Sequence, residues 1–448
     1  MNDKRQNHQL VLAFWDESRS EAPRVSVEGT ESFAAKRGTE SPAIDEQWME
    51  EVCERENCKQ ALARVKANKG SPGMDRMTVQ QLPEYLKQHW PTIREQLLSG
   101  TYKPQPVKRV EIPKPDGGVR KLGIPTVLDR LIQQAVMQVL QRKWDRTFSE
   151  HSYGFRPGRS AHQAVEAAQK YIAEGYRWVV DLDMEKFFDR VNHDKLMAKI
   201  AERVSDKRML GLIRTFLRAG VLEEGLVNPV DEGTPQGGPL SPLLSNIVLD
   251  EFDQELERRG LRFARYADDS NIYVRSKRVG ERVMEGLKRF LTTRLKLKVN
   301  ELKSAVARPW ERKFLGFRFT NRREPKRRIA PKAVDRFKER VRKLTSRTRG
   351  VSIERMAEEL TRYLRGWLGY FGKCETPWVL LGLEQWLRRR LRSGSSGNGE
   401  RRGLPNSANG AWDAIWPLKR PGADTGRGGW RTHRPFPLHC PMPTSTRS

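Results

Sequence analysis

Two adjacent acids, Asp268 and Asp269, are the residues of this chain best placed to do chemistry. The segments on either side, Leu261 to Arg265 and Asn271 to Val274, alternate apolar with polar residues, which predicts a β-hairpin with the acids at its tip. Adjacent carboxylates on a tight turn can bind two divalent cations, and such a pair, about 3.5 to 4 Å apart, stabilises the attacking and leaving oxygens of phosphoryl transfer. The alternative is an ordinary Asp-Asp turn, because Asp tolerates unusual backbone angles.

A third acid, Asp183, follows the apolar segment Arg177 to Leu182, which reads as a short buried strand. An acid from a neighbouring strand can complete the coordination of a metal pair, so Asp183 is a candidate for the same site. The order of these acids resembles that of reverse transcriptases, with Asp183 as the first catalytic acid and Tyr266 to Asp269 as the second catalytic motif.

This resemblance assigns further roles near the first acid. It implies that Asp183, Asp268, Asp269 and the main chain of Met184 bind two Mg²⁺ ions. It also implies that Phe188 lies under the incoming sugar and excludes a ribose 2′-hydroxyl. An ordinary core phenylalanine is the alternative for Phe188.

Composition favours a polyanionic partner. The chain has 448 residues, with 84 Lys and Arg against 56 Asp and Glu, a formal net charge of +28 and a pI near 10.2. Nucleic acid is the first candidate, because cations that neutralise phosphates release counterions. No apolar run approaches the roughly 20 residues that span a membrane, and no signal peptide opens the chain, so we expect a protein of the bacterial cytosol or nucleoid without a membrane partner. The four cysteines have neither a disulfide pattern nor zinc spacing: Cys53, Cys58, Cys374 and Cys440.

A basic hairpin is predicted over Val107 to Val127, with its turn at Asp116 and Gly117. A mobile hairpin that carries cations suits a triphosphate, although a solvated hairpin is the alternative. With the distant acids present, Lys114 and Arg120 match the positions at which reverse transcriptase fingers clasp the nucleotide phosphates.

A second loop, Gly233 to Pro242, precedes a helix predicted over Leu243 to Leu256. Gln236 stands before Gly237, and two adjacent glycines let the backbone approach a flat base pair closely. The order of hairpin, first acid, Pro-Gln-Gly-Gly loop and Tyr-Ala-Asp-Asp motif is that of a reverse transcriptase. The resemblance therefore places Gln236 and Gly237 at the nucleotide.

Three further segments resemble parts of group II intron reverse transcriptases. Arg156 and Arg159 lie in a Gly- and Arg-bearing turn like the fingers insertion of these enzymes, where phosphate contact is expected. Lys303 matches a lysine near the leaving pyrophosphate, where a cation or general acid helps. The alternating segment Phe314 to Phe319 resembles the primer-gripping strand, with a core strand as the alternative.

Three helices are predicted at about 331–347, 352–371 and 376–392, in a region dense in cations. They resemble the helical thumb, or maturase domain, of intron-encoded enzymes, whose partner is intron RNA. Four arginines are candidates for RNA contact: Arg327, Arg328, Arg362 and Arg365. Aromatic residues interleave with these cations, but the helical spacing of Trp367 and Tyr370 favours a core position over an RNA platform.

Both ends of the chain lack a hydrophobic period. Residues 1–43 are predicted to be a mostly disordered extension. Residues 393–448 are rich in Gly, Pro, Arg and Trp, which is typical of a disordered RNA-binding tail. We prefer a frameshift near residue 393. Asn406 to Trp416 and Gly429 to Ser448 can be back-translated with permitted codons and read one nucleotide earlier. In that frame the first window can spell a helix-like peptide and the second a maturase-like peptide. The nucleotide sequence tests this hypothesis.

The resemblance to group II intron reverse transcriptase/maturases covers roughly residues 48–392. It implies an α+β right-hand polymerase, with fingers and an antiparallel palm sheet over 44–310 and a primer-grip strand with a helical thumb/maturase domain over 311–392. The expected function is RNA-directed DNA synthesis with Mg²⁺, together with splicing and mobility of the host intron. The expected partners are intron RNA, an RNA template with a DNA primer, and deoxynucleoside triphosphates, and a homodimer remains open.

Two other functions stay open. The chain could be an RNA-binding splicing cofactor without polymerase activity, although three intact acids argue against it. It could also be a bacterial reverse transcriptase with a non-intron role, such as defence or diversification. We expect no DNA cleavage, because the Cys pairs and His-Asn signature of the nuclease domain that some relatives append are missing.

Overall fold

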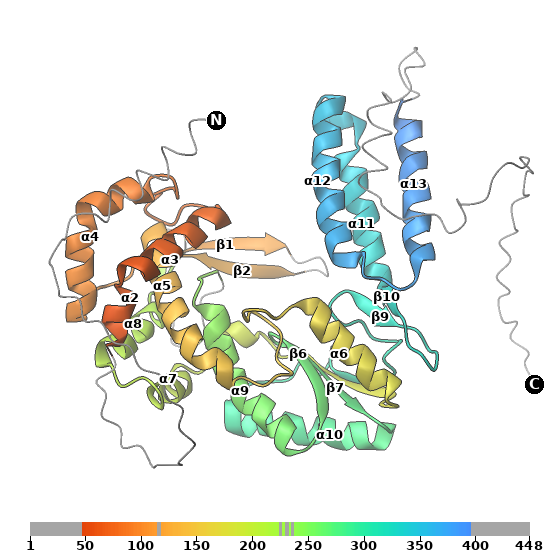
Figure 1. Cartoon of the computed structure of the whole chain (residues 1–448), viewed down its shortest axis with the longest axis horizontal. Coiled ribbons are helices and arrows are strands. Elements are labelled where there is room, and N and C mark those ends of the chain that lie inside the picture. The colour runs from red at the N-terminus through yellow and green to blue at the C-terminus, as the bar shows by residue number, and fades with distance from the viewer. Residues whose placement is uncertain (1–46, 114–117, 224–225, 229–232, 234–236, 396–448) are drawn as a thin grey trace, which may run out of the picture. The chain divides into compact units, whose positions relative to one another are not determined.

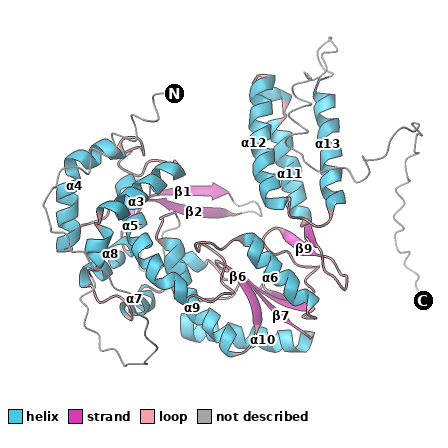
Figure 2. Cartoon of the chain, viewed as in Figure 1, coloured by secondary structure: helices cyan, strands magenta, loops and turns pink. Residues whose placement is uncertain are grey.

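The computed structural model describes residues 47–113, 118–223, 226–228, 233 and 237–395. The chain divides into unit 1, Met1–Ala333 with Cys374–Thr376, and unit 2, Val334–Lys373 with Pro377–Ser448. Figure 2 colours the described helices and strands. The predicted N-terminal extension, the tail from residue 396 and the predicted site residues Lys114 and Gln236 lie outside the described residues.

The helices of unit 1 form where apolar residues recur at helical spacing and polar residues cap the first turn. Thr126 accepts a hydrogen bond from the Asp129 N–H at the start of α5, and Ser160 forms a capping box with Gln163 at the start of α6. The helix predicted over Leu243 to Leu256 is confirmed as α9. The observed bounds of the helices are α2 Trp48–Val52, α3 Arg55–Asn68, α4 Leu82–Ser99, α5 Val127–Trp144, α6 Ala161–Ala173, α7 His193–Ala201, α8 Lys207–Leu217, α9 Ser241–Arg258 and α10 Lys277–Phe290.

One sheet of unit 1 contains the predicted basic hairpin. Strands β1 (Val107–Pro113) and β2 (Val119–Ile124) pair in antiparallel register, with Ile112 opposite Arg120. The sequence did not predict β4 (Val221–Glu223) and β5 (Leu226–Asn228), which extend the sheet in the order β2-β1-β4-β5. Each has three residues, too few for an alternating pattern to stand out, and β4 pairs in parallel with the distant β1.

A second sheet has the order β6-β7-β3-β8, with every neighbouring pair antiparallel. Its strands are β3 Trp178–Leu182, β6 Arg262–Tyr266, β7 Asp269–Val274 and β8 Ala305–Ala307. Helix α10 packs closely on one face, where a Cβ on Gly280 would lie 2.5 Å from Val306 Cγ1. On the other face Tyr171 of α6 contacts Tyr273, with ring centroids 5.7 Å apart (Figure 1). Helices on both faces therefore bury the central strands.

The predicted strand Phe314 to Phe319 is shorter than expected. Leu315 and Gly316 have φ angles of 50° and 82°, and the main chains of Phe314 and Phe317 exchange two hydrogen bonds of 2.9 Å. This tight turn leaves only β9, Phe317–Phe319, which pairs with β10, Arg327–Ile329. Both strands belong to unit 1, so the division of the chain falls at Ala333, whereas the sequence grouped this segment with the following helices.

Unit 2 is built from three helices, as predicted: α11 Pro331–Leu344, α12 Ile353–Phe371 and α13 Pro377–Ser395. The first residues of α11, up to Ala333, belong to unit 1. The fully buried Phe337 packs against Trp367 with ring centroids 4.4 Å apart, and also contacts Trp386 of α13. Trp367 is therefore a core residue. The predicted α+β fold, an antiparallel sheet flanked by helices and followed by a helical domain, is confirmed.

Among the helices of the described ranges, none combines the length and the apolar character that crossing a bilayer requires.

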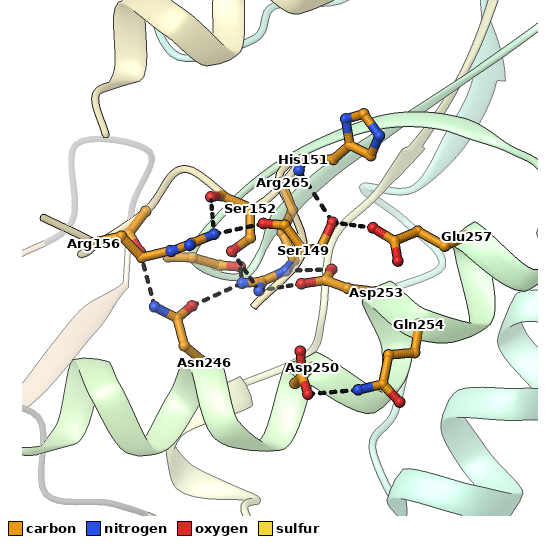
Figure 3. A network of polar contacts seen from close by, with 12 residues as sticks. Ser149, His151, Ser152, Arg156, Asn246, Asp250, Asp253, Gln254, Glu257 and Arg265 are labelled. Atoms are coloured by element: carbon orange, nitrogen blue, oxygen red, sulfur yellow. Dashed lines mark hydrogen bonds and ion pairs between the residues drawn. The ribbon is translucent and has the colours of Figure 1, made fainter. Parts of the chain in front are cut away.

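A buried acid in α9 gives unit 1 a pH-dependent stability. Asp250 is 2% exposed, and only its Oδ2 accepts a hydrogen bond within the described residues, from Gln254 (Figure 3). Burial, together with repulsion by Asp253, raises the pKa of Asp250 to about 6. Since the ordinary Asp pKa is about 3.9, the folded state binds this proton more tightly than the unfolded state does. The stabilisation is complete below about pH 4 and is lost as the pH rises through 6.

Asp250→Asn removes this titration and should stabilise the protein at neutral and higher pH. We expect its free energy of unfolding at pH 8 to exceed that of the natural chain by about 2 kcal/mol. The difference should disappear near pH 4. Urea unfolding at both pH values measures it, and an equal change at both would contradict the assignment.

Candidate active site

The hairpin formed by β6 and β7 presents the two adjacent acids as predicted. Tyr266 and Asp269 are the last cross-strand pair, so Ala267 and Asp268 make a two-residue turn. Ala267 has a φ of 59°, which lies in the left-handed region that residues other than Gly seldom adopt. Both acids are half-buried at the end of the sheet.

Asp183 lies at the same end of the sheet. Strand β3 runs beside β7, and its last pair joins Leu182 to Ser270. One further step along this register places Asp183 opposite Asp269, where Cα atoms of antiparallel strands lie about 4.5 to 5.5 Å apart. The structure thus brings Asp183 to the same strand end as Asp268 and Asp269, although more than eighty positions separate it from them in the chain.

Mutual repulsion marks this group of acids. Burial raises the pKa of Asp269 to about 8, and the neighbouring carboxylates of Asp181, Asp268 and Asp183 add to the rise. Lys313 acts in the opposite direction but is outweighed. Negative charge that is crowded and partly removed from water favours a bound cation.

The ligand atoms suit Mg²⁺. Carboxylate and main-chain carbonyl oxygens are the hard donors that this ion prefers, and it commonly uses one or two carboxylates together with substrate phosphates and water. Within the described ranges, no three or more His, Cys, Asp or Glu side chains are already arranged so that they could hold a metal ion. The bridge between Met184 and Val299 uses hydrogen bonds from the Asn300 N–H to the Asp183 carbonyl and from the Glu185 N–H to the Lys298 carbonyl, so it does not engage the Met184 carbonyl.

Lys303 lies beside the first acid. Its Nζ is 3.9 Å from Asp183 Oδ2, and its side chain is 65% exposed. The loop that carries it is fastened to Asp183, because Ser304 Oγ accepts from the Asp183 N–H and the Asn300 N–H donates to the Asp183 carbonyl. The predicted role of Lys303 beside the leaving pyrophosphate stays a prediction.

Lys303→Ala should slow DNA synthesis about tenfold, the effect expected for one partly solvated charge near the reacting phosphates. The affinity for a primer-template duplex should stay within a factor of two, since this lysine is one of many cations on the chain. Single-turnover primer extension together with duplex binding separates the two quantities. A loss of binding with an unchanged rate would assign Lys303 to duplex contact instead.

The described residues predicted to contact the nucleotide lie in three segments. Phe188 is half-buried in the turn Phe187–Asp189 and meets Phe187 edge to face at 5.3 Å. Gly237 has a φ of 133°, and a Cβ there would lie 2.5 Å from the Gly123 carbonyl of β2, so its loop packs tightly against the basic hairpin. Arg120 lies in β2, and its side chain is outside the described part of the structure.

Two arginines predicted to bind RNA have structural partners instead. Arg156 is 8% exposed and donates to Asp145 and to the carbonyls of Ser149 and Ser152. Its guanidinium is therefore committed to the turn that it belongs to, and the prediction of a phosphate contact is wrong.

Arg327 is similarly committed. It forms ion pairs with Glu166 at 3.0 Å and Glu375 at 3.4 Å, and its side chain is 15% exposed. Its N–H and carbonyl also bond to Glu375, which fastens the segment Cys374–Thr376 to β10. A primary role in RNA contact does not agree with these bonds.

The other arginines predicted to bind RNA are more accessible. Arg328, Arg362 and Arg365 are exposed, and Arg362 pairs with Glu358 one helical turn away at 2.8 Å. Arg159 is half-buried, with its guanidinium carbon 5.9 Å from the centre of the Tyr153 ring. These four remain candidates for RNA contact.

Sequence reasoning missed several residues beside the acids. Asp181 lies two residues before Asp183 on the same face of β3 and forms an ion pair with Arg312 at 2.6 Å. Arg312 also donates to the Lys303 carbonyl, so it links the lysine loop to β3. The period of two in β3 was a signal for Asp181, whereas nothing local identified Arg312.

Comparison with protein-family models gives two matches. Residues 112–319 match the family described as reverse transcriptase (RNA-dependent DNA polymerase). Residues 334–394 match the family described as group II intron, maturase-specific domain. The second match falls on the three helices of unit 2. The first covers the sheet β6-β7-β3-β8 and, apart from residues 107–111 of β1, the sheet β2-β1-β4-β5.

Curated proteins give similar matches. The chain is 41% identical over 195 residues to Protein YkfC of Escherichia coli (strain K12), which covers 43% of this chain and 51% of that protein. It is 42% identical over 174 residues to the group II intron-encoded protein LtrA of Lactococcus lactis subsp. cremoris, covering 39% and 29% respectively. The chain thus spans about half or less of the length of these relatives.

Among solved structures, a chain of a partial Cas6-RT-Cas1–Cas2 complex is similar, with a TM-score of 0.36 and 25% identity. This similarity covers 56% of this chain and 43% of that one.

Proposed function

Because the chain belongs to the reverse transcriptases that carry a group II intron maturase domain, we propose that it is an RNA-directed DNA polymerase encoded by a group II intron. In this role it binds intron RNA to assist splicing and copies that RNA during intron mobility. The observation that carries the proposal is the meeting of Asp183 with Asp268 and Asp269 at one end of the β3 and β7 strands. Carboxylates that lie close together repel one another, which is unfavourable at the end of a sheet that has only a structural role.

The site residues have distinct tasks in this reaction, which joins a primer 3′-hydroxyl to the α-phosphate of a deoxynucleotide and releases pyrophosphate. Asp183, Asp268, Asp269 and the Met184 carbonyl would hold two Mg²⁺ ions, whose chemistry when bound is to stabilise charge on the reacting phosphate oxygens. Lys303 Nζ lies 3.9 Å from Asp183 Oδ2, and from there it would supply positive charge to the leaving pyrophosphate.

Other residues of the unit bind and select the substrate. Phe188 supports the sugar, and the tight packing of Gly237 on β2 lets the main chain lie close to the base pair. The hairpin β1–β2 supplies cations for the triphosphate.

The helical unit supports the RNA-binding half of the proposal. In α11 the buried residues Phe337, Val341 and Leu344 form one face, and the opposite face is exposed. Cations dominate the exposed face, where they can neutralise phosphates of a folded RNA. Within unit 2 they are Arg336, Arg340, Arg342 and Lys343.

Primer extension tests the polymerase. The natural chain, with a DNA primer on an RNA template, deoxynucleotides and Mg²⁺, should synthesise DNA. In parallel, binding to the RNA of its own intron should exceed binding to an unstructured RNA of equal length. A folded, soluble chain that binds intron RNA but makes no DNA would instead be a splicing cofactor.

A reverse transcriptase with a non-intron role is the remaining alternative. It differs from the proposal in the genetic context, because an intron-encoded protein is surrounded by its intron. Folded intron RNA elements in the flanking nucleotides support the proposal, and a flank without them contradicts the intron part of it.

A further inference from the structure

A completely buried arginine, Arg265, lies beneath the catalytic turn. It is 0% exposed and stands in β6, two residues before Ala267. Asp253 of α9, also 0% exposed, accepts from its Nε at 2.7 Å and from its Nη2 at 2.5 Å (Figure 3). This bidentate pair fixes the plane of the guanidinium.

The remaining donors of Arg265 join three different segments. Its Nη2 also donates to Ser152 Oγ at 2.7 Å, and its Nη1 donates to Asn246 Oδ1 at 3.0 Å. The last bond runs from Nη1 to the carbonyl of Ala267 at 2.9 Å. All five N–H groups of the guanidinium are therefore used within the protein.

The Ala267 carbonyl is the group through which Arg265 contacts the catalytic turn. Ala267 is held in the left-handed region, with a φ of 59°, and its carbonyl carbon belongs to the peptide that leads into Asp268. A residue other than Gly keeps such a conformation only where the surrounding structure enforces it. The bond from Arg265 supplies this constraint from below, so it fixes the peptide from which the Asp268 side chain projects.

The segment before α6 closes the turn from a second side. Ser152 forms a bridge with Arg265, and the Tyr153 N–H donates to the Arg265 carbonyl at 2.8 Å. A Cβ on Gly154 would lie only 2.3 Å from the Ala267 nitrogen, and the Gly154 carbonyl accepts from Asn246 at 2.9 Å. This close approach leaves the turn little room to move.

We propose that Arg265 is a positioning residue of the polymerase site. Held by Asp253, it fixes the Ala267–Asp268 peptide and thereby holds the Asp268 carboxylate in the orientation that binds the metal. The proposal deepens the proposed function and rests on it. A merely structural ion pair would affect folding alone, whereas a positioning residue also sets the affinity for the metal ion.

The test uses the full-length chain and Mn²⁺ as the probe, with free Mn²⁺ measured by electron paramagnetic resonance. Arg265→Lys keeps a positive charge beside Asp253 but lacks the planar fork that reaches the Ala267 carbonyl. We expect its Mn²⁺ affinity to fall about tenfold, the effect typical of residues that orient metal ligands. The Mg²⁺ concentration for half-maximal primer extension should rise by a similar factor, with the KM for primer-template unchanged.

Arg208→Lys is the matched control. Arg208 of α8 also binds a carboxylate with both terminal nitrogens, Glu50 at 2.8 and 3.0 Å, and donates to a main-chain carbonyl, that of Leu98. This variant should match the natural chain in Mn²⁺ affinity. Asp268→Ala defines which part of the Mn²⁺ signal comes from the catalytic turn.

A double variant, Arg265→Met with Asp253→Leu, guards against a failure of Arg265→Lys to fold. Replacing both partners leaves no unpaired buried charge, so stability is retained while the bond to Ala267 is removed. Weakened Mn²⁺ binding by either folded variant supports the proposal. Natural Mn²⁺ affinity in both, or a natural chain whose Mn²⁺ binding does not depend on Asp268, overturns it. If the natural chain binds Mn²⁺ through Asp268 but makes no DNA, the polymerase proposal fails while the Mn²⁺ titration still decides the role of Arg265.

Discussion

Asp268→Ala and Asp269→Ala will each reduce RNA-templated DNA synthesis at least about 1000-fold, because the metal pair contributes several kcal/mol and about 1.4 kcal/mol corresponds to a factor of ten. Both side chains lie at the end of the hairpin, where the strand register places Asp269 opposite Asp183. Single-nucleotide incorporation with saturating primer-template and Mg²⁺ measures the loss.

Folding and chemistry are separable in this experiment. Burial and, after it, repulsion by the neighbouring carboxylates raise the pKa of Asp269, so both effects disfavour the charged acid in the metal-free protein. Truncating one of the acids should therefore not lower the thermal unfolding temperature of the metal-free protein. Asp194→Ala is the control. Asp194 lies on α7, its side chain is 80% exposed, and it pairs with Arg214 of α8. Its rate should stay within a factor of two, and substantial DNA synthesis by either acid variant would refute the assignment.

Phe188→Ala will lower the preference for deoxynucleotides over ribonucleotides about 100-fold, which is the discrimination that an apolar contact can achieve against one added hydroxyl. Phe188 is half-buried, and its ring meets that of Phe187 edge to face, which restrains its position. In sequence it follows closely after Asp183. Removing the ring opens space for the 2′-hydroxyl. The ratio of kcat/KM for dCTP and CTP measures the effect.

Phe187 provides the matched control for this substitution. It is the adjacent phenylalanine but is 2% exposed and belongs to the core. Phe187→Leu should lower stability and leave the preference for deoxynucleotides intact. An unchanged preference in Phe188→Ala would show that Phe188 is a core residue as well.

The sequence predicted the parts of the site that follow from short-range patterns. The period of two on both sides of Tyr266 to Asp269 predicted the two strands of the hairpin correctly, although helices cover both faces of the sheet and both kinds of position in β7 are buried. The apolar run before Asp183 predicted β3. That Asp183 and Asp269 meet came from the family resemblance, and the strand register supplies its physical basis.

The sequence was less informative where burial depends on distant partners. Arg156 and Arg265 have the same chemical character as a surface arginine, and only the positions of Asp145 and Asp253 in the folded chain bury them. The same limit applies to the Phe314 turn, because Leu315 is a non-glycine residue with a positive φ, which no sequence pattern announces.

The segment Cys374–Thr376 restricts how the helical unit of this chain can be exchanged for another. It stands between α12 and α13, yet it belongs to unit 1, where Glu375 pairs with Arg327 and accepts from Gln169 at 2.7 Å. The helical unit is therefore not a simple modular appendage. Recombination at a single junction near Ala333 would remove three residues that complete the polymerase unit, so a successful exchange must import a helical unit that carries its own substitute for Glu375.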